Sequence, residues 1–280
     1  GGDLFYHFHY GLLAGIVGVW TVGLAGIAML AATLTGVLIG RRRLLVDLLT
    51  VRFRTVALRA WSDVHNAAGL LMMPFLLIIG ITGLMILWSI YVAGGTSSSG
   101  EAGASLPGLL HFGRFAGVAS RWAYFLMGLT SALVIATGLA TRTVRRRRGR
   151  ANRSEPVLSG LADGAVAGAV AGLLVAVASF FWINRLLPTF VPQRADWEIR
   201  VFFCVWAACV LYGPLRRDTI LAWRDQMAAA ATLLALLPAL NVLTTRSHVL
   251  TTVPNSQWGL AAIDLTALVV GVLLAWLAVR

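Results

Sequence analysis

The sequence predicts an all-α, polytopic transmembrane helical bundle, and three observations lead to that fold class. Hydrophobic residues make up 59% of the 280 residues and charged residues only 12%, with a mean hydropathy of +0.82. Soluble domains carry about 25% charged residues. Apolar runs recur at lengths that suffice to cross a bilayer, which takes about 20 residues each. Arginines fall in the short connections between these runs, as they do in membrane proteins.

Seven apolar runs predict seven spans, with ends defined to within a few residues. They cover residues 10–40, 66–92, 116–143, 159–187, 197–213, 224–244 and 257–279. No cleavable signal peptide is expected in residues 1–10, which lack a charged n-region and a small-residue cleavage site. The arginine-rich run 141–155 separates the first three spans from the last four. We therefore expect two domains, a three-helix core over 1–145 and a four-helix membrane extension over 146–280.

Arginine predicts the topology, because the net charge of +12 is carried without any lysine. One set of alternate connections holds Arg41, Arg42, Arg43, Arg52, Arg54, Arg59, Arg142, Arg145, Arg146, Arg147, Arg148, Arg150, Arg153, Arg216, Arg217, Arg224 and Arg280. The other set holds Arg114, Arg121, Arg185, Arg194, Arg200 and Arg246. By the positive-inside rule the first set is cytoplasmic, so the N-terminus lies outside and the C-terminus inside. Arginine confined to such loops does not indicate a nucleic-acid partner.

Small and sulfur-containing residues in the later spans indicate packing. Gly164, Gly168 and Gly172 form a small-xxx-small stripe that lets helix backbones approach closely. Cys204 and Cys209 lie five residues apart in an apolar run, on different helix faces, so neither a disulfide nor a metal pair is implied. The segment 94–100 is read as a flexible connector. No P-loop, dinucleotide fingerprint, cysteine metal motif or nucleophile elbow is present.

Four of the five histidines fall on the predicted outer side, and His65 alone on the inner side. A haem inside a helical bundle needs imidazoles from two helices at one depth, small residues beside them and cations for the propionates. His9 opens the first span and His111 leads into the third, so both lie near one depth. Arg114 lies three residues after His111 on the same predicted helical face and Arg121 a further seven residues on, with Gly113 and Gly117 beside them. An interfacial histidine with snorkelling arginines is the alternative.

His7 and His9 cannot both face the bundle if their segment is helical, because two residues turn a helix by about 200°. His7 shares its predicted face with Gly11, Gly15 and Gly18, a smooth stripe that could seat a porphyrin. The face of His9 carries larger aliphatic side chains. Helix geometry alone therefore favours His7.

On the inner side, His65 shares a face with Gly69 and Met72, a spacing that suits an axial ligand with a gap above it. It equally suits a core-facing histidine that follows Asp63 as the N-cap of the second span. With no second inner histidine, an inner haem would need Met72, Met73 or a ligand from elsewhere.

For the remaining polar residues, a structural role is preferred over a functional one. His248, in the last outer loop, is interpreted as solvated. Asp264 lies inside the last span, and an intramembrane carboxylate is a functional hypothesis by default. Arg185, Asn184 and Asn241 fall at similar depth, so a structural polar cluster is expected, with a proton or substrate path as the second interpretation. A secondary transporter built on Asp264 and Arg185 lacks support from an inverted repeat.

Several ordered motifs carry a family resemblance. They are Phe5–Tyr10 with the glycine-rich helix after it, Arg41–Thr50, Trp61–Asn66 with Pro74-Phe75, and His111-Phe112 followed by Arg121–Phe125. Over about residues 3–145 the chain resembles the PepSY-associated transmembrane family, whose members are often labelled iron-regulated membrane proteins. The last four spans resemble the C-terminal extension of longer members, through Phe181–Arg185 and Arg194–Trp197.

The resemblance implies a multi-pass b-type cytochrome of the bacterial inner membrane, an enzyme that reduces ferric iron in siderophore complexes on the periplasmic side. One or two haem b groups, a ferric siderophore and a cytoplasmic or quinol electron donor would be its cofactors and partners. The family's histidines fall on His9, His65 and His111, which leaves His7 in reserve. The alternative is a non-enzymatic accessory or transport protein for iron or siderophore uptake, without haem.

Two departures from the family pattern bear on the inner site. The family begins with a further transmembrane helix and a periplasmic PepSY domain, and this sequence starts after both. Long members often carry histidines where this chain has Gly40 and Leu76. Both differences weaken the expectation of an inner haem more than that of an outer one.

Overall fold

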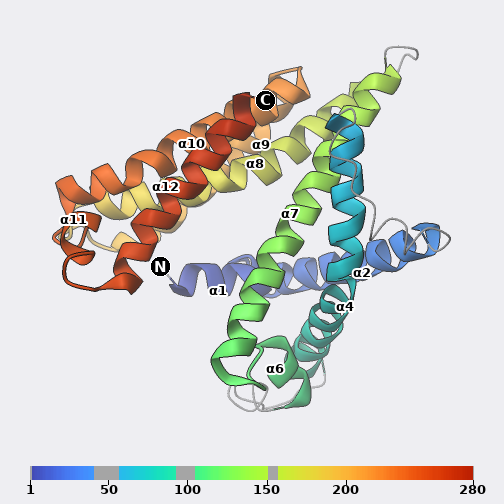
Figure 1. Ribbon diagram of the computed structural model, residues 1–280, viewed down its shortest axis with the longest axis horizontal. Coiled ribbons are helices and arrows are strands. Elements are labelled where there is room, and N and C mark those ends of the chain that lie inside the picture. The colour runs from blue at the N-terminus through green and yellow to red at the C-terminus, as the bar shows by residue number, and fades with distance from the viewer. Residues whose placement is uncertain (1, 41–56, 93–104, 151–156, 280) are drawn as a thin grey trace. The chain divides into compact units, whose positions relative to one another are not determined.

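The computed structural model describes residues 2–40, 57–92, 105–150 and 157–279, and every regular element among them is a helix (Figure 1). The elements are α1 (Gly2–Gly11), α2 (Gly15–Gly40), α4 (Ala57–Tyr91), α6 (Leu106–His111), α7 (Gly117–Arg150), α8 (Val157–Leu186), α9 (Arg194–Leu215), α10 (Thr219–Thr244), α11 (Val249–Thr252) and α12 (Trp258–Val279). The connector 94–100 and the arginines between 41 and 54 lie outside the described residues.

Seven of these helices are long and apolar enough to cross a membrane, which confirms the predicted number of spans. They are α2, α4, α7, α8, α9, α10 and α12. Their mean hydropathies over an 18-residue window range from 1.5 to 2.6. The all-α, multi-pass membrane class follows from the apolar length of each run.

The described chain divides into two compact units, Gly1–Thr141 and Arg142–Arg280. The boundary falls at the start of the arginine-rich run. The first part of that run does not form a loop, because α7 continues through it to Arg150.

The first unit departs from the prediction at its first span, where the structure has two helices, α1 and α2, in place of one continuous helix. Leu12 and Leu13 adopt left-handed backbone angles, with φ of 50° and 56°, and α1 therefore ends before α2 begins. A Cβ at Gly18 would overlap the carbonyl of Gly11, so glycine is needed for this turn. The expected stripe that joined His7 to Gly15 and Gly18 is wrong, because no continuous helix connects them.

Helix α4 begins at Ala57, nine residues before the predicted start at residue 66. Asp63 lies buried inside the helix and is not its N-cap, so that prediction is wrong. Hydropathy marked only the most apolar part of the helix, so the span predicted from the sequence omitted its more polar first turns.

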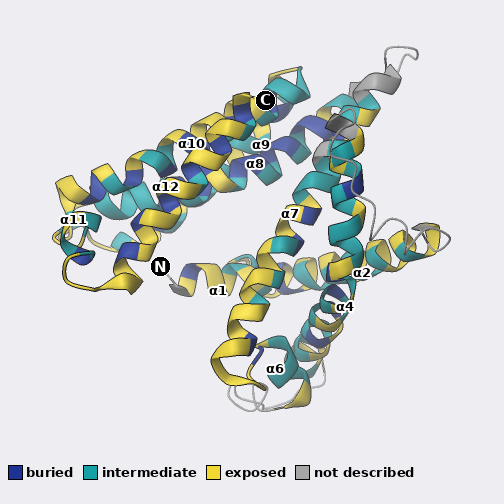
Figure 2. Cartoon of the chain, in the orientation of Figure 1, coloured by how far each residue is buried: buried dark blue, intermediate teal, exposed yellow. Residues whose placement is uncertain are grey.

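In the second unit, α8, α9, α10 and α12 run alongside one another (Figure 1). Their facing sides are buried while their outer sides are exposed, as the colours of Figure 2 show. The predicted glycine stripe lies at the α8–α9 contact: a Cβ at Gly164 would lie 2.7 Å from the backbone of Gly213, and one at Gly168 would overlap the carbonyl of Cys209. The stripe therefore serves packing, as predicted. Cys204 and Cys209 are not bonded to each other.

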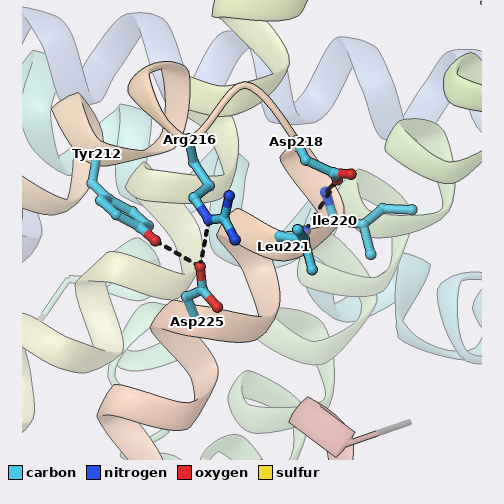
Figure 3. Close-up of polar contacts among 6 residues, drawn as sticks. All are labelled: Tyr212, Arg216, Asp218, Ile220, Leu221 and Asp225. Carbon is cyan, nitrogen blue, oxygen red and sulfur yellow. Dashed lines mark hydrogen bonds and ion pairs between the residues drawn. The ribbon is translucent and has the colours of Figure 1, made fainter.

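The α9–α10 connection is fixed by two carboxylates (Figure 3). Asp218 caps α10, its Oδ1 accepting from two backbone N–H groups of the first turn at 3.0 and 3.2 Å. Asp225 Oδ2 accepts from the Tyr212 hydroxyl at 2.6 Å and from Arg216 Nε at 2.9 Å. The cap at Asp218 explains why α10 starts at Thr219, five residues before the expected residue 224.

Candidate functional site

The first unit brings two histidines together from segments far apart in sequence. His9 near the end of α1 and His111 at the end of α6 have ring centres 6.2 Å apart, with their planes inclined by 35°. Helix α6 packs on α4, and α1 packs on α2. His9 is exposed and His111 is half-buried. The pair predicted for one depth is therefore one side-chain cluster.

The spacing of this pair can be compared with that of two axial ligands. First-row metals bind an imidazole nitrogen at about 2 Å, so imidazoles on opposite sides of one iron have ring centres about 6 Å apart. The 6.2 Å between His9 and His111 fits this requirement. The donor set also fits, because two imidazoles are a common axial pair for haem iron.

His111 is held on one side by the C-terminal part of α4. Its Nδ1 lies 3.1 Å from the Thr82 hydroxyl oxygen. Burial lowers the pKa of His111, and the nearby His9 lowers it further, while a hydrogen bond to the Ile79 backbone acts in the opposite direction. The net decrease in pKa favours the neutral imidazole, which is the form that binds a metal.

A glycine beside Thr82 makes room for the His111 ring. A Cβ at Gly83 would lie 3.0 Å from His111 Cε1, closer than side chains normally pack. The pair Thr82-Gly83 was missed in the sequence. In the sequence the two residues are only a Thr-Gly dipeptide within an apolar helix. Such a dipeptide does not indicate a histidine-binding position unless the contact with the His111 ring is known.

His65 lies on the wall of a cavity of about 920 Å³ between α2, α4 and α7. Ligand sites usually enclose about 300–1,000 Å³, so the cavity is of a size to admit a large flat cofactor. Gly69, predicted to share the His65 face, also lines it. Two thioethers face it, Met29 from α2 and Met73 from α4. Met72, the other predicted candidate, is buried within the bundle.

The His65 ring meets a second Thr-Gly pair, on α7. Its Nδ1 lies 3.4 Å from the Thr137 hydroxyl oxygen. A Cβ at Gly138 would lie 2.7 Å from His65 Cε1, so no larger residue fits there without displacing the ring. His65 and His111 thus have the same two kinds of neighbour.

His7 has a different environment from His9. It is exposed, and its Nδ1 lies 2.7 Å from the Tyr10 hydroxyl. Tyr6 makes edge contacts with both of these rings. The geometric preference for His7 depended on the glycine stripe, which the break after α1 removes.

The expected arrangement of arginines around His111 is also different. Because α6 ends at His111, Arg114 is not one turn further along the same helix. Its guanidinium lies 5.2 Å from the centre of the Phe112 ring, and Arg121 is exposed in the first turns of α7. Gly113 and Gly117 have φ of 59° and 62°; Gly113 lies in the turn between α6 and α7, and Gly117 is the first residue of α7.

The polar residues of the second unit form a hydrogen-bonded network, as predicted, in which Asn241 and Asp264 are buried. Arg185 Nε donates to Asn241 Oδ1 at 2.6 Å, and Asn241 Nδ2 donates to Asp264 Oδ1 at 2.5 Å. Asp264 Oδ2 accepts from the Val249 backbone N–H at 2.8 Å. Asn184 joins the network by accepting from Arg185. Asp264 therefore fixes the short helix α11 onto the bundle.

His248 is not the solvated loop residue expected from the sequence. It is half-buried and stands at the N-cap of α11, where its backbone N–H donates to the Thr251 hydroxyl at 3.2 Å. Its position is explained by the cap.

Comparison with known protein families finds a match within the first unit. Residues 2–109 match the family described as the PepSY-associated TM region. His9, His65 and Thr82 lie inside the matched residues, and His111 lies two residues beyond them. Searches of curated proteins and of solved structures found no match to the chain. The family that matches residues 2–109 of this membrane protein is therefore the one that the motifs of the sequence indicated.

Proposed function

We propose that this protein is a haem b-binding electron carrier of the bacterial inner membrane that reduces ferric iron in siderophore complexes on the periplasmic side. The observation that carries the proposal is the His9–His111 pair, whose 6.2 Å spacing suits two axial ligands of one iron. The match of residues 2–109 to the PepSY-associated TM region supports the same function.

Each histidine has a distinct part in this proposal. His9 and His111 would hold one haem, and the lowered pKa of His111 favours the neutral imidazole that binds iron. His65 would hold a second haem in its cavity, and Met29 or Met73 could supply a thioether as the second ligand. Arg114 and Arg121 are candidates for neutralising propionates. Bound haem supplies reversible one-electron transfer between ferric and ferrous iron.

The two sites lie toward opposite ends of α4, which suits transfer across a membrane. His65 and Thr82, which contacts His111, are 17 residues apart in α4, or about 25 Å along the helix axis. The distribution of arginines supports an outer position for the His9–His111 pair and an inner one for His65. A quinol or cytoplasmic donor would therefore deliver electrons near His65, and the ferric chelate would meet the protein near His9.

An absorption spectrum of the full chain, purified from haem-replete cells, tests this proposal. We expect a Soret band and a reduced-minus-oxidised difference spectrum of the b type. In proteoliposomes with an enclosed reductant, the wild-type protein should reduce an external ferric hydroxamate siderophore, and His111→Ala should not.

The absence of a Soret band would overturn the cytochrome function and favour the non-enzymatic accessory protein. A haem-loaded protein that leaves the external siderophore oxidised would overturn the reductase activity alone.

A further inference from the structure

We propose that Thr82 and Thr137 are positioning residues that fix the tautomers of His111 and His65, so that Nε2 of each ring carries the lone pair available to iron. The inference rests on the proposed haem function and names what orients its ligands. Each threonine hydroxyl has only one hydrogen to donate, and the partner that receives it determines which ring nitrogen of the histidine carries a proton.

A threonine hydroxyl has one hydrogen and two acceptor positions. Thr82 Oγ1 lies 2.6 Å from the Ile78 carbonyl oxygen one turn earlier, which is the shorter of its two backbone contacts and takes the hydrogen. We therefore assign the histidine as the donor in the 3.1 Å contact between His111 Nδ1 and Thr82; the His111 ring also makes a hydrogen bond to the Ile79 backbone. A neutral imidazole that carries its proton on Nδ1 has its lone pair on Nε2.

The same arrangement occurs independently at the other end of α4. Thr137 Oγ1 donates to the Leu133 carbonyl at 2.7 Å, so we assign His65 Nδ1 as the donor in its longer, 3.4 Å contact with Thr137. Two threonines on different helices thus donate their hydroxyl hydrogen to a backbone carbonyl one turn earlier. This leaves each hydroxyl oxygen free to accept from a histidine N–H. In each case the next residue is a glycine against which the ring lies.

Such contacts matter for metal ligands. A ligating histidine normally donates its second N–H to a neighbouring acceptor, which fixes the ring orientation and raises the basicity of the ligand. Loss of a partner of this kind typically costs about 10–100-fold in metal affinity. A more basic imidazole also favours ferric over ferrous iron.

The test compares Thr82→Val with Thr82→Ser, and Thr137→Val with Thr137→Ser, in the full chain. Thr130→Val is the matched control, because the Thr130 hydroxyl on α7 donates to the Leu126 carbonyl one turn earlier, at 2.8 Å, as the hydroxyls of Thr82 and Thr137 do to theirs. Two readouts are used: ¹⁵N chemical shifts of the imidazoles in haem-depleted protein, and the haem dissociation rate with the midpoint potential in loaded protein.

We expect each valine variant to lose the fixed Nδ1–H tautomer of its own histidine, to release haem about 10–100-fold faster and to raise the midpoint potential at that site. The serine variants should restore wild-type values, and Thr130→Val should not differ from wild type. Unchanged tautomers and haem release in both valine variants would overturn the inference while leaving the proposed function intact. A wild-type protein that binds no haem but has both Nδ1–H tautomers would overturn the function and retain the positioning roles.

Discussion

At the scale of single residues, the backbone turn after α1 determines whether His7 or His9 is the candidate ligand that pairs with His111. The sequence allowed only one of them to face the bundle, and an unbroken helix favoured His7. The left-handed Leu12 and Leu13 separate α1 from the glycines below, and His9 is the ring that meets His111. Backbone angles of this kind at leucine are rare, so no sequence rule predicts them.

The lowered pKa of His111 leads to a pH dependence of stability. In the unfolded chain a histidine binds its proton near pH 6.5, whereas His111 in the fold binds it only at lower pH because it is buried and faces His9. Between these two values the unfolded state binds more protons, so the fold loses stability as the pH falls below about 6.5.

We therefore expect the melting temperature of haem-depleted protein to fall on acidification from pH 7 to 5.5, and to fall less in His111→Gln. Thermal unfolding in detergent, followed by tryptophan fluorescence, measures both. Equal slopes for the two proteins would show that burial of His111 does not produce the pH dependence. His9→Gln, which removes the second cause of the shift, should give an intermediate slope.

At the scale of helices, the spans were predictable and the contacts between them were not. Apolar length identified all seven long helices, because each crossing needs about 20 apolar residues. The start of α4 and the break after α1 were missed, because hydropathy does not register polar helical turns or left-handed residues. The Thr-Gly pairs were missed because each acquires meaning only from a ring on another helix.

The glycine on α7 that borders His65 gives a prediction at this scale. Gly138→Ala should displace the His65 ring, because the added Cβ would lie 2.7 Å from Cε1, and such overpacking typically costs about 1–3 kcal/mol. We expect loss of haem from the His65 cavity with the His9–His111 haem retained, measured as the haem-to-protein ratio.

Gly128→Ala is the control on the same helix, since a Cβ at Gly128 would have no described atom within 4 Å. It should keep the wild-type ratio and not lower stability, because alanine is favoured over glycine in helices by about 1 kcal/mol. A full haem complement in Gly138→Ala would contradict the account of this cavity.

At the scale of the whole molecule, the proposed haem chemistry belongs to the first unit, and the hydrogen-bonded polar network that we expect to stabilise the fold belongs to the second. All the candidate haem ligands lie in the first unit, whereas the Asp264 network lies in the second. The sequence predicted that Arg185, Asn184, Asn241 and Asp264 would cluster, since intramembrane polar groups need partners. It did not predict that Asp264 would hold the backbone of α11.

Asp264→Ala should lower the thermal stability of the full chain without changing its haem spectrum. The substitution leaves Asn241 Nδ2 and the Val249 N–H without their acceptor, at a cost of about 1–3 kcal/mol for each buried group. Asp196→Ala, at an exposed position in the first turn of α9, is the control and should have a small effect. Proton-coupled uptake into liposomes that depends on Asp264 would instead support a transport function.

The central claim is that His9 and His111 hold one haem between them, and the haem-to-protein ratio of ligand variants tests it most directly. The full chain is purified from haem-replete cells as wild type, His7→Ala, His9→Ala and His111→Ala. We expect His7→Ala to match the wild type, and His9→Ala and His111→Ala each to lose the same single haem. Wild-type haem content in both His9→Ala and His111→Ala, or loss of haem only in His7→Ala, would contradict the claim.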